Sequence, residues 1–152
     1  MITVQYPDTE FRMKKENGKQ FIFDAIRKSW LLLTEEEWVR QNIVNYLITV
    51  LKYPSTVIAL EKEILLNDLK KRFDVLVYDR ELKPWMMIEC KARSVRLSED
   101  VLQQVLRYNI TIPVEYILIT NGNTTIGWKK ENHGLAMLSE LPLWSERFEV
   151  SG

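Results

Sequence analysis

The stretch from Lys71 to Lys91, KRFDVLVYDRELKPWMMIECK, predicts two strands joined by a turn. The segments 72–79 and 85–92 are rich in branched and aromatic residues, and residues 80–83, Arg-Glu-Leu-Lys, form a four-residue loop between them. Hydrophobic side chains occupy both faces, so the hairpin should be buried on both sides. The residues expected on one face are Val75, Val77, Met86 and Ile88, and those on the other are Leu76, Tyr78, Trp85 and Met87.

Two carboxylates face each other in this hairpin. With the loop at 80–83, Asp74 lies opposite Glu89, and Lys91 shares their face because side chains alternate along a strand. Like charges in opposed positions destabilise a sheet, and a divalent cation would compensate them. Mg²⁺ binds carboxylate, carbonyl and water oxygens, so the expected ligands are both carboxylates and the Cys90 carbonyl, with Lys91 beside the bound water. The alternative is an exposed strand end without a metal.

Two helices are predicted around these strands. Residues 34–37, Thr-Glu-Glu-Glu, fit a capping box that begins a helix, and Pro54 marks its end. A broad apolar stripe along this helix contains Arg40 and has Glu37 at its edge. A second helix is expected to begin at Ser98 and to run to about Asn109.

The remaining strands complete the fold class. Residues 57–66 precede the hairpin, and 114–120 and 124–129 follow the second helix. The order of helix, three strands, helix and two strands predicts an α/β fold with a central mixed sheet flanked by helices. Asn17-Gly18 predicts a type I′ turn, and hence a β-hairpin within 11–23 that covers the core.

The composition is that of one folded domain of 152 residues with 46% hydrophobic residues. We expect 1–30 to hold the hairpin and a lead-in, 31–130 the core, and 131–152 a C-terminal extension. A single cysteine excludes an internal disulfide, which is typical of the cytoplasm. No apolar run reaches the ~18 residues of a membrane span, so we expect a cytoplasmic protein without a membrane partner.

The net charge of the chain is zero, so only local basic clusters could attract a nucleic acid. The candidate DNA-binding residues are Lys71 and Arg72 in one cluster and Arg93 and Arg96 in another. The alternative interpretation of both clusters is a solvated charged surface.

Several blocks of the chain together resemble a known family. They are similar to the N-terminal domain of type I restriction enzyme R (HsdR) subunits, and Asp74 with Glu89-Cys90-Lys91 fits the signature of the PD-(D/E)xK nuclease superfamily. The resemblance extends from about Asp24 to Trp144. Its blocks are Thr34 to Gln41, Leu60 to Ile64, Lys71 to Asp74, Ile88 to Ala92, Arg107 to Asn109 and Thr120 to Gly122.

The resemblance implies a restriction-endonuclease-like α-β-β-β-α-β core and Mg²⁺-dependent hydrolysis of double-stranded DNA, with Mn²⁺ as a substitute. It implies that Asp74 and Glu89 are metal ligands and that Lys91 is the catalytic lysine. Phe73 stands where the superfamily has proline, a departure that leaves the ligands intact.

Three further residues match the family but have local alternatives. Glu37 matches a helix-one glutamate that completes the acidic metal site in this superfamily, although the capping box alone explains it. Gln104 and Tyr108 match a Q-x-x-x-Y motif with a catalytic role, and they lie at the border of an apolar helix stripe. The alternative for this pair is a polar rim and a core tyrosine.

We therefore expect a Mg²⁺-dependent DNA endonuclease domain without a motor domain or an ATP site. Coupling to a motor would need another restriction-modification subunit, and a homodimer would supply two active sites for double-strand cleavage. The alternative is a catalytically silent DNA-binding or assembly module of the same fold that acts with partner subunits. Salt-dependent DNA binding and stabilisation by Mg²⁺ distinguish the two.

Overall fold

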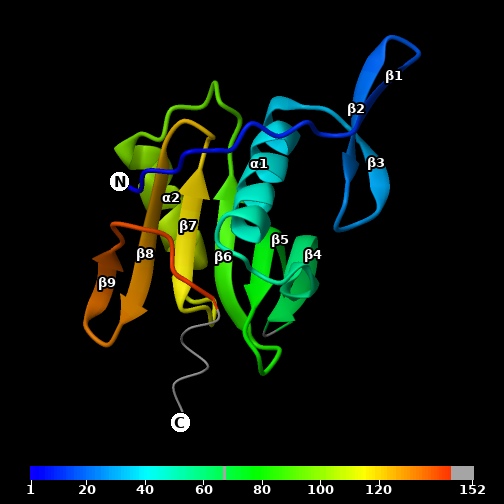
Figure 1. Cartoon of the computed structure of the whole chain (residues 1–152). Helices are drawn as coiled ribbons and strands as arrows, with labels where there is room; N and C mark the ends of the chain where they lie inside the picture. Colours follow the sequence, from blue (N-terminus) through cyan, green and yellow to red (C-terminus); the bar gives the residue numbers. More distant parts are fainter. Residues whose placement is uncertain (67, 145–152) are drawn as a thin grey trace.

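A six-stranded mixed sheet forms the centre of the molecule in the computed structural model, which describes residues 1–66 and 68–144 (Figure 1). Strands β6 and β7 are parallel and all other neighbours are antiparallel, which confirms the predicted α/β class. In spatial order the strands are β4 (Ile58–Leu66), β5 (Leu69–Tyr78), β6 (Pro84–Cys90), β7 (Tyr116–Thr120), β8 (Thr125–Glu131) and β9 (Gly134–Met137).

Two helices cover opposite faces of this sheet (Figure 1). Helix α1 (Glu35–Thr49) packs on one face and α2 (Glu99–Asn109) on the other, and a short 3₁₀ helix, η1 (Ser55–Val57), follows α1. Both helices begin as predicted, because the side chains of Thr34 and Ser98 accept hydrogen bonds from backbone N–H groups of the first turn. Within the described residues, no helix is long and apolar enough to span a membrane.

The β5–β6 hairpin has the predicted register, although its turn is longer than predicted. Val75 pairs with Ile88, so the next facing positions along the hairpin are Asp74 and Glu89. The four-residue loop is wrong, because Tyr78 pairs with Pro84 and five residues connect the strands. A bulge beside Tyr78 absorbs the additional residue, and the register on the side of Asp74 is therefore preserved.

The two faces of the hairpin follow the prediction except at Trp85. Val75 and Ile88 pack under α1, and Leu76 and Met87 pack under α2. Trp85 was expected beside Met87 but lies in the cluster under α1. Its ring contacts the rings of Tyr53 and Tyr116 there, at centroid distances of 6.1 and 5.1 Å. Because Trp85 lies at the start of β6 next to the bulge, the regular alternation of side chains does not hold there.

A separate three-stranded sheet stands beside α1 (Figure 1). Strands β1 (Met13–Glu16) and β2 (Lys19–Asp24) form the predicted hairpin, with Asn17 and Gly18 at the positive φ values that a type I′ turn requires. The sequence pattern predicts neither β3 (Ser29–Leu32), which pairs with β2, nor β9, which adds residues 134–137 of the expected C-terminal extension to the central sheet.

Candidate active site

Asp74 and Glu89 lie side by side at the end of the β5–β6 ladder. The Asp74 Oδ2 accepts a hydrogen bond of 2.8 Å from the Cys90 N–H, which holds the Asp74 side chain against β6. Lys91 follows one residue later, and its Nζ lies 3.4 Å from the Glu89 Oε1. The structure thus brings together the two predicted carboxylates and the predicted lysine.

The electrostatics of the pair fit a site that takes a cation. Burial raises the pKa of Glu89, and the adjacent Asp74 carboxylate raises this pKa further. Lys91 acts in the opposite direction, but the pKa of Glu89 stays above its ordinary value. Burial and the Asp74 carboxylate together therefore outweigh the effect of Lys91 on this pKa, and a divalent cation would stabilise both carboxylate charges.

The donor atoms at this edge are those that Mg²⁺ prefers. The Lys91 N–H donates to the Thr120 carbonyl of β7, whereas the Cys90 N–H points to Asp74 on β5. Because the N–H and C=O of one strand residue point the same way, the Cys90 carbonyl faces the Asp74 side. Burial raises the pKa of the Cys90 thiol well above its usual range, which leaves the carbonyl as the donor of this residue. Two carboxylates and a carbonyl fit Mg²⁺ with water completing its shell.

Glu37 is not brought to the other two carboxylates. Its backbone N–H donates to the Thr34 hydroxyl, as the capping box predicts. Its carboxylate, however, accepts from Arg40 Nη1 at 2.8 Å, from Gln41 Nε2 at 3.0 Å and from Arg27. In residues 1–66 and 68–144, no three His, Cys, Asp or Glu side chains lie together as a metal-ligand group. The expectation that Glu37 completes the acidic metal site is therefore not met by this structure.

Arg40 links α1 to Asp74 through a buried network of ion pairs. Its side chain is 4% exposed and contacts Glu61 at 2.7 Å, in addition to Glu37. Burial acts to lower the pKa of Arg40, but the surrounding carboxylates outweigh it and the pKa is raised. The sequence pattern does not predict Glu61 as a member of this network, although an arginine within the apolar stripe of a helix is itself a signal of a buried ion pair.

A cleft of about 230 Å³ opens on the α2 side of Glu89 and Lys91. Gln104 and Tyr108 of α2 line this cleft. The Q-x-x-x-Y pair therefore shares the cleft with Glu89 and Lys91, as a catalytic role would require. Asp74 does not line the cleft, because its carboxylate lies between the α1 network and Glu89. The remaining lining residues are Arg72, Val105 and Asn109.

Two of the four predicted DNA-binding residues, Lys71 and Arg72, lie beside this cleft. The Lys71 Nζ donates to the backbone carbonyl of Tyr108 at 2.7 Å and lies 3.8 Å from the centre of its ring. Arg72 is exposed and pairs with Glu61 at 2.7 Å. Arg93 and Arg96 are exposed in the loop that follows Lys91. Arg72 therefore lines the cleft and Lys71 lies over a ring that lines it, whereas Arg93 lines a small cavity with Trp38 and Gly122.

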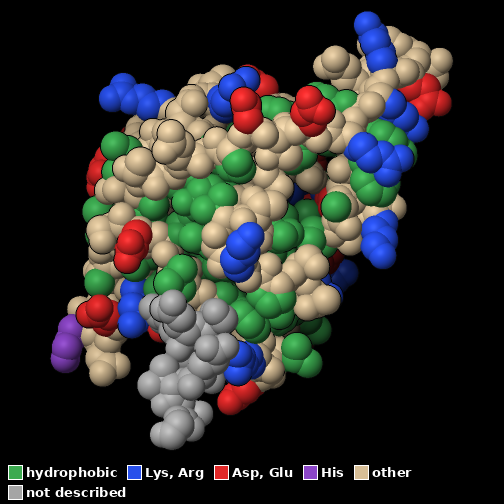
Figure 2. Space-filling view, in the orientation of Figure 1, with side chains coloured by type: hydrophobic (Ala, Val, Ile, Leu, Met, Phe, Trp, Pro, Cys, Tyr) green, Lys and Arg blue, Asp and Glu red, His purple; other side chains and the backbone are tan. Residues whose placement is uncertain are grey.

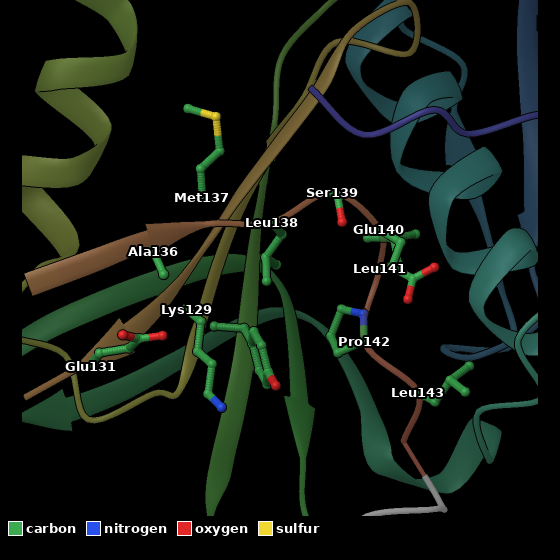
Figure 3. A pocket seen from close by; sticks show the side chains of 11 residues that line it. Lys129, Glu131, Ala136, Met137, Leu138, Ser139, Glu140, Leu141, Pro142 and Leu143 are labelled. Atoms are coloured by element: carbon green, nitrogen blue, oxygen red, sulfur yellow. The ribbon is translucent and has the colours of Figure 1, made fainter.

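A second cavity, of about 470 Å³, lies away from this chemistry (Figure 3). It is formed by β8, β9 and residues 138–143, and its charged lining residues are Lys129, Glu131 and Glu140. None of the predicted site residues lines it. The acidic pair and the lysine therefore mark the candidate active site at the end of β6.

Comparison with known proteins adds one finding. Residues 35–142 match the family model described as type I restriction enzyme R protein N terminus (HSDR_N). Among curated proteins, none matches the chain. The matched range begins with the first residue of α1 and contains both helices and all six strands of the central sheet, whereas β1, β2 and β3 precede it.

Proposed function

The chain belongs to the family of type I restriction enzyme R protein N-terminal domains, and on this basis we propose that it is a Mg²⁺-dependent DNA endonuclease domain. The observation that carries the proposal is the placement of Asp74 beside Glu89, with Lys91 3.4 Å from the Glu89 carboxylate. This arrangement supports phosphodiester hydrolysis because it combines oxygen donors for a hard cation with a positive charge at the same edge.

In this proposal, Asp74, Glu89 and the Cys90 carbonyl hold the metal, which supplies Lewis-acid activation of the phosphodiester when it is bound. Mn²⁺ would serve in its place. The Lys91 ammonium donates a hydrogen bond to the attacking water or to a phosphate oxygen and offsets the negative charge that develops there. The water oxygen bonds to phosphorus and gives up a proton to solvent, while the bond to the leaving oxygen breaks and that oxygen takes a proton from solvent.

The groups around the site would position the DNA. Gln104 lines the cleft opposite Lys91 and offers an amide to a phosphate or sugar oxygen. Lys71 and Arg72 on one side, with Arg93 and Arg96 in the loop beyond β6, would contact phosphates of the duplex. Because the chain has no net charge, these contacts give modest affinity, and other restriction-modification subunits would supply the rest.

The test is the cleavage of supercoiled plasmid in Mg²⁺ or Mn²⁺, together with the melting temperature of the protein with and without metal. We expect the native chain to cut and to be stabilised by the metal, and Asp74→Asn to lose both effects. Asp8→Asn, which changes an exposed carboxylate outside the site, is the matched control and should behave as the native chain does. Native cleavage that persists in Asp74→Asn would refute the assignment.

The second candidate is a catalytically silent module that binds DNA or assembles with partner subunits. The observation that favours it is the engagement of Glu37 with Arg40, since only two carboxylates then come together at the site. A native chain that binds DNA in a salt-dependent way, but neither cuts nor gains stability from Mg²⁺, would support this candidate over the nuclease.

A further inference from the structure

The N-terminal sheet presents aromatic rings on one of its faces. Phe21 and Phe23 alternate on β2, and Trp30 of β3 pairs directly with Phe23. The rings of Phe23 and Trp30 meet edge to face, with centroids 5.3 Å apart. All three side chains are only partly buried, which leaves apolar ring surface at the exterior of the sheet.

Two cations lie over these rings. The Arg12 guanidinium is 4.5 Å from the centre of the Phe23 ring, and the Lys14 Nζ is 4.7 Å from that of Trp30. Lys14 pairs with Phe21 across β1 and β2, so it projects from the same face. Arg12, Lys14, Phe21, Phe23 and Trp30 together form what we call the aromatic face.

The segment that carries the aromatic face is basic although the chain as a whole is neutral. Residues 12–28 contain six Lys or Arg and two Asp or Glu. Asp24 is buried and paired with Arg27, and Glu16 lies 3.2 Å from Lys14. Lys and Arg side chains gather on the projecting sheet next to hydrophobic ones (Figure 2). This local excess of positive charge complements a polyanion.

We propose that the aromatic face binds single-stranded DNA. Bases without partners can stack on Phe21, Phe23 and Trp30 when Arg12 and Lys14 turn from the rings to the phosphates between the bases. A duplex offers no free base faces, so the rings select an unpaired strand. The identity of the polymer as DNA rests on the proposed function, whereas the preference for an unpaired strand rests on the rings. The sequence predicts that this hairpin covers the core, but among the described residues no member of β1, β2 or β3 belongs to the two core clusters.

The sheet is held in a fixed position beside the candidate active site. Arg27, which follows β2, contacts Asp24 at 2.5 Å, Glu37 of α1 at 3.3 Å and Glu61 of β4 at 3.2 Å. The end of β3 and Ala92, the residue after Lys91, line one open depression of about 560 Å³. The residues of the aromatic face do not line this depression, whose charged lining residues are Arg40 and the glutamates 35, 36, 37 and 61.

The test measures fluorescence anisotropy of a labelled oligothymidylate of about 20 nucleotides and of a duplex of equal length, in EDTA to prevent cleavage. Trp30→Leu should weaken single-strand binding at least about fivefold. Arg12→Gln combined with Lys14→Gln, both at exposed positions, should make the negative slope of log affinity against log salt less steep. The expected change is about 1.4, or about 0.7 per phosphate contact. Lys52→Gln with Lys83→Gln, two exposed lysines outside this sheet, should leave affinity and slope unchanged.

The outcomes separate this inference from the nuclease proposal. Binding in EDTA does not use the metal site, so the native chain should bind the oligonucleotide even if it never cuts plasmid. The inference is overturned if the native chain does not bind the single strand, or if the aromatic-face variants bind as tightly as the control. It is also overturned if these variants weaken duplex binding equally, or if they change only the sedimentation of the protein, which would indicate a contact with a second copy.

Discussion

The Nη2 of Arg40 lies 3.6 Å from the Asp74 Oδ1, so a buried arginine of α1 contacts a carboxylate of the candidate metal site. The other terminal nitrogen, Nη1, contacts Glu37 and Glu61 at 2.8 and 2.7 Å. Within the described part of the chain, the buried Arg40 Nε has no hydrogen-bond partner. The ion pairs of the two terminal nitrogens therefore position the Arg40 side chain. They also connect the N-terminal half of α1 to the edge of the sheet that carries Asp74.

Replacement of Arg40 by methionine should destabilise the fold strongly. It leaves the buried Glu37 carboxylate with Arg27 as its remaining ion-pair partner, and removal of one member of a buried pair costs about 3–5 kcal/mol. We expect the free energy of unfolding, measured in urea, to fall by an amount near the lower end of this range. Arg72→Gln is the matched control, because Arg72 is 65% exposed and its pair with Glu61 should contribute less than about 1 kcal/mol. Equal losses in the two variants would contradict the dominant role of the buried arginine.

The ion pairs of Glu61 should make stability depend on pH. Partial burial acts to raise the pKa of Glu61, but Arg40, Arg72 and Arg27 together lower it below its ordinary value of 4.5. A carboxylate with a lowered pKa in the folded state stabilises the protein above the unfolded pKa, and this stabilisation is lost as the pH falls through the folded pKa.

The measurement is the difference in melting temperature between the native chain and Glu61→Gln from pH 7 down to about pH 3. The native chain should be more stable at pH 7, and the difference should shrink below pH 4.5. Glu63→Gln, at a more exposed carboxylate of the same strand, should give a small difference at every pH. A constant difference for Glu61→Gln would show that its charge does not carry the effect.

Local signals predict much of the fold. The N-cap residue Thr34 determines where α1 begins, and Asn17-Gly18 determines the first hairpin, because both depend on residues close in sequence. The facing of Asp74 and Glu89 was predicted from an assumed loop at 80–83, because a pattern that is hydrophobic on both faces does not by itself determine the register. The error in loop length at 80–83 did not matter because the bulge lies on the far side of Val77.

Features that depend on distant partners are not predictable in this way. Strands β3 and β9 have four residues each and form because β2 and β8 provide edges for pairing. The ion pair of Arg40 with Glu61 joins residues 21 positions apart, on a helix and on a strand that no periodic pattern relates. The Glu37 carboxylate belongs to the same network. For this reason the match to the family motif did not predict where this carboxylate lies.

The role of Lys91 in the chemical step should be separable by mutation from the role of the metal ligands. Lys91→Met removes the ammonium that offsets charge in the reaction but leaves Asp74, Glu89 and the Cys90 carbonyl in place. We expect cleavage to fall at least about a hundredfold, while Mg²⁺ still raises the melting temperature. Asp74→Asn should lose both, although its amide oxygen can still accept the Cys90 N–H. Loss of metal stabilisation in Lys91→Met would indicate that the lysine supports metal binding rather than the chemical step.

Gln104 offers a test of whether the cleft beside α2 takes part in the reaction. Its side chain lines the cleft with Glu89 and Lys91, whereas its neighbour Gln103 donates to Glu99 on the exposed side of the helix at 3.2 Å. A hydrogen bond to a charged group contributes about 1.5–3 kcal/mol, so Gln104→Ala should slow plasmid cleavage about tenfold or more. Gln103→Ala has the same intrinsic effect on the helix and should leave the rate within about twofold, because an exposed side chain contributes little. Equal rates in the two variants would mean that the cleft does not hold the substrate, and Gln104 would then be part of a polar helix rim.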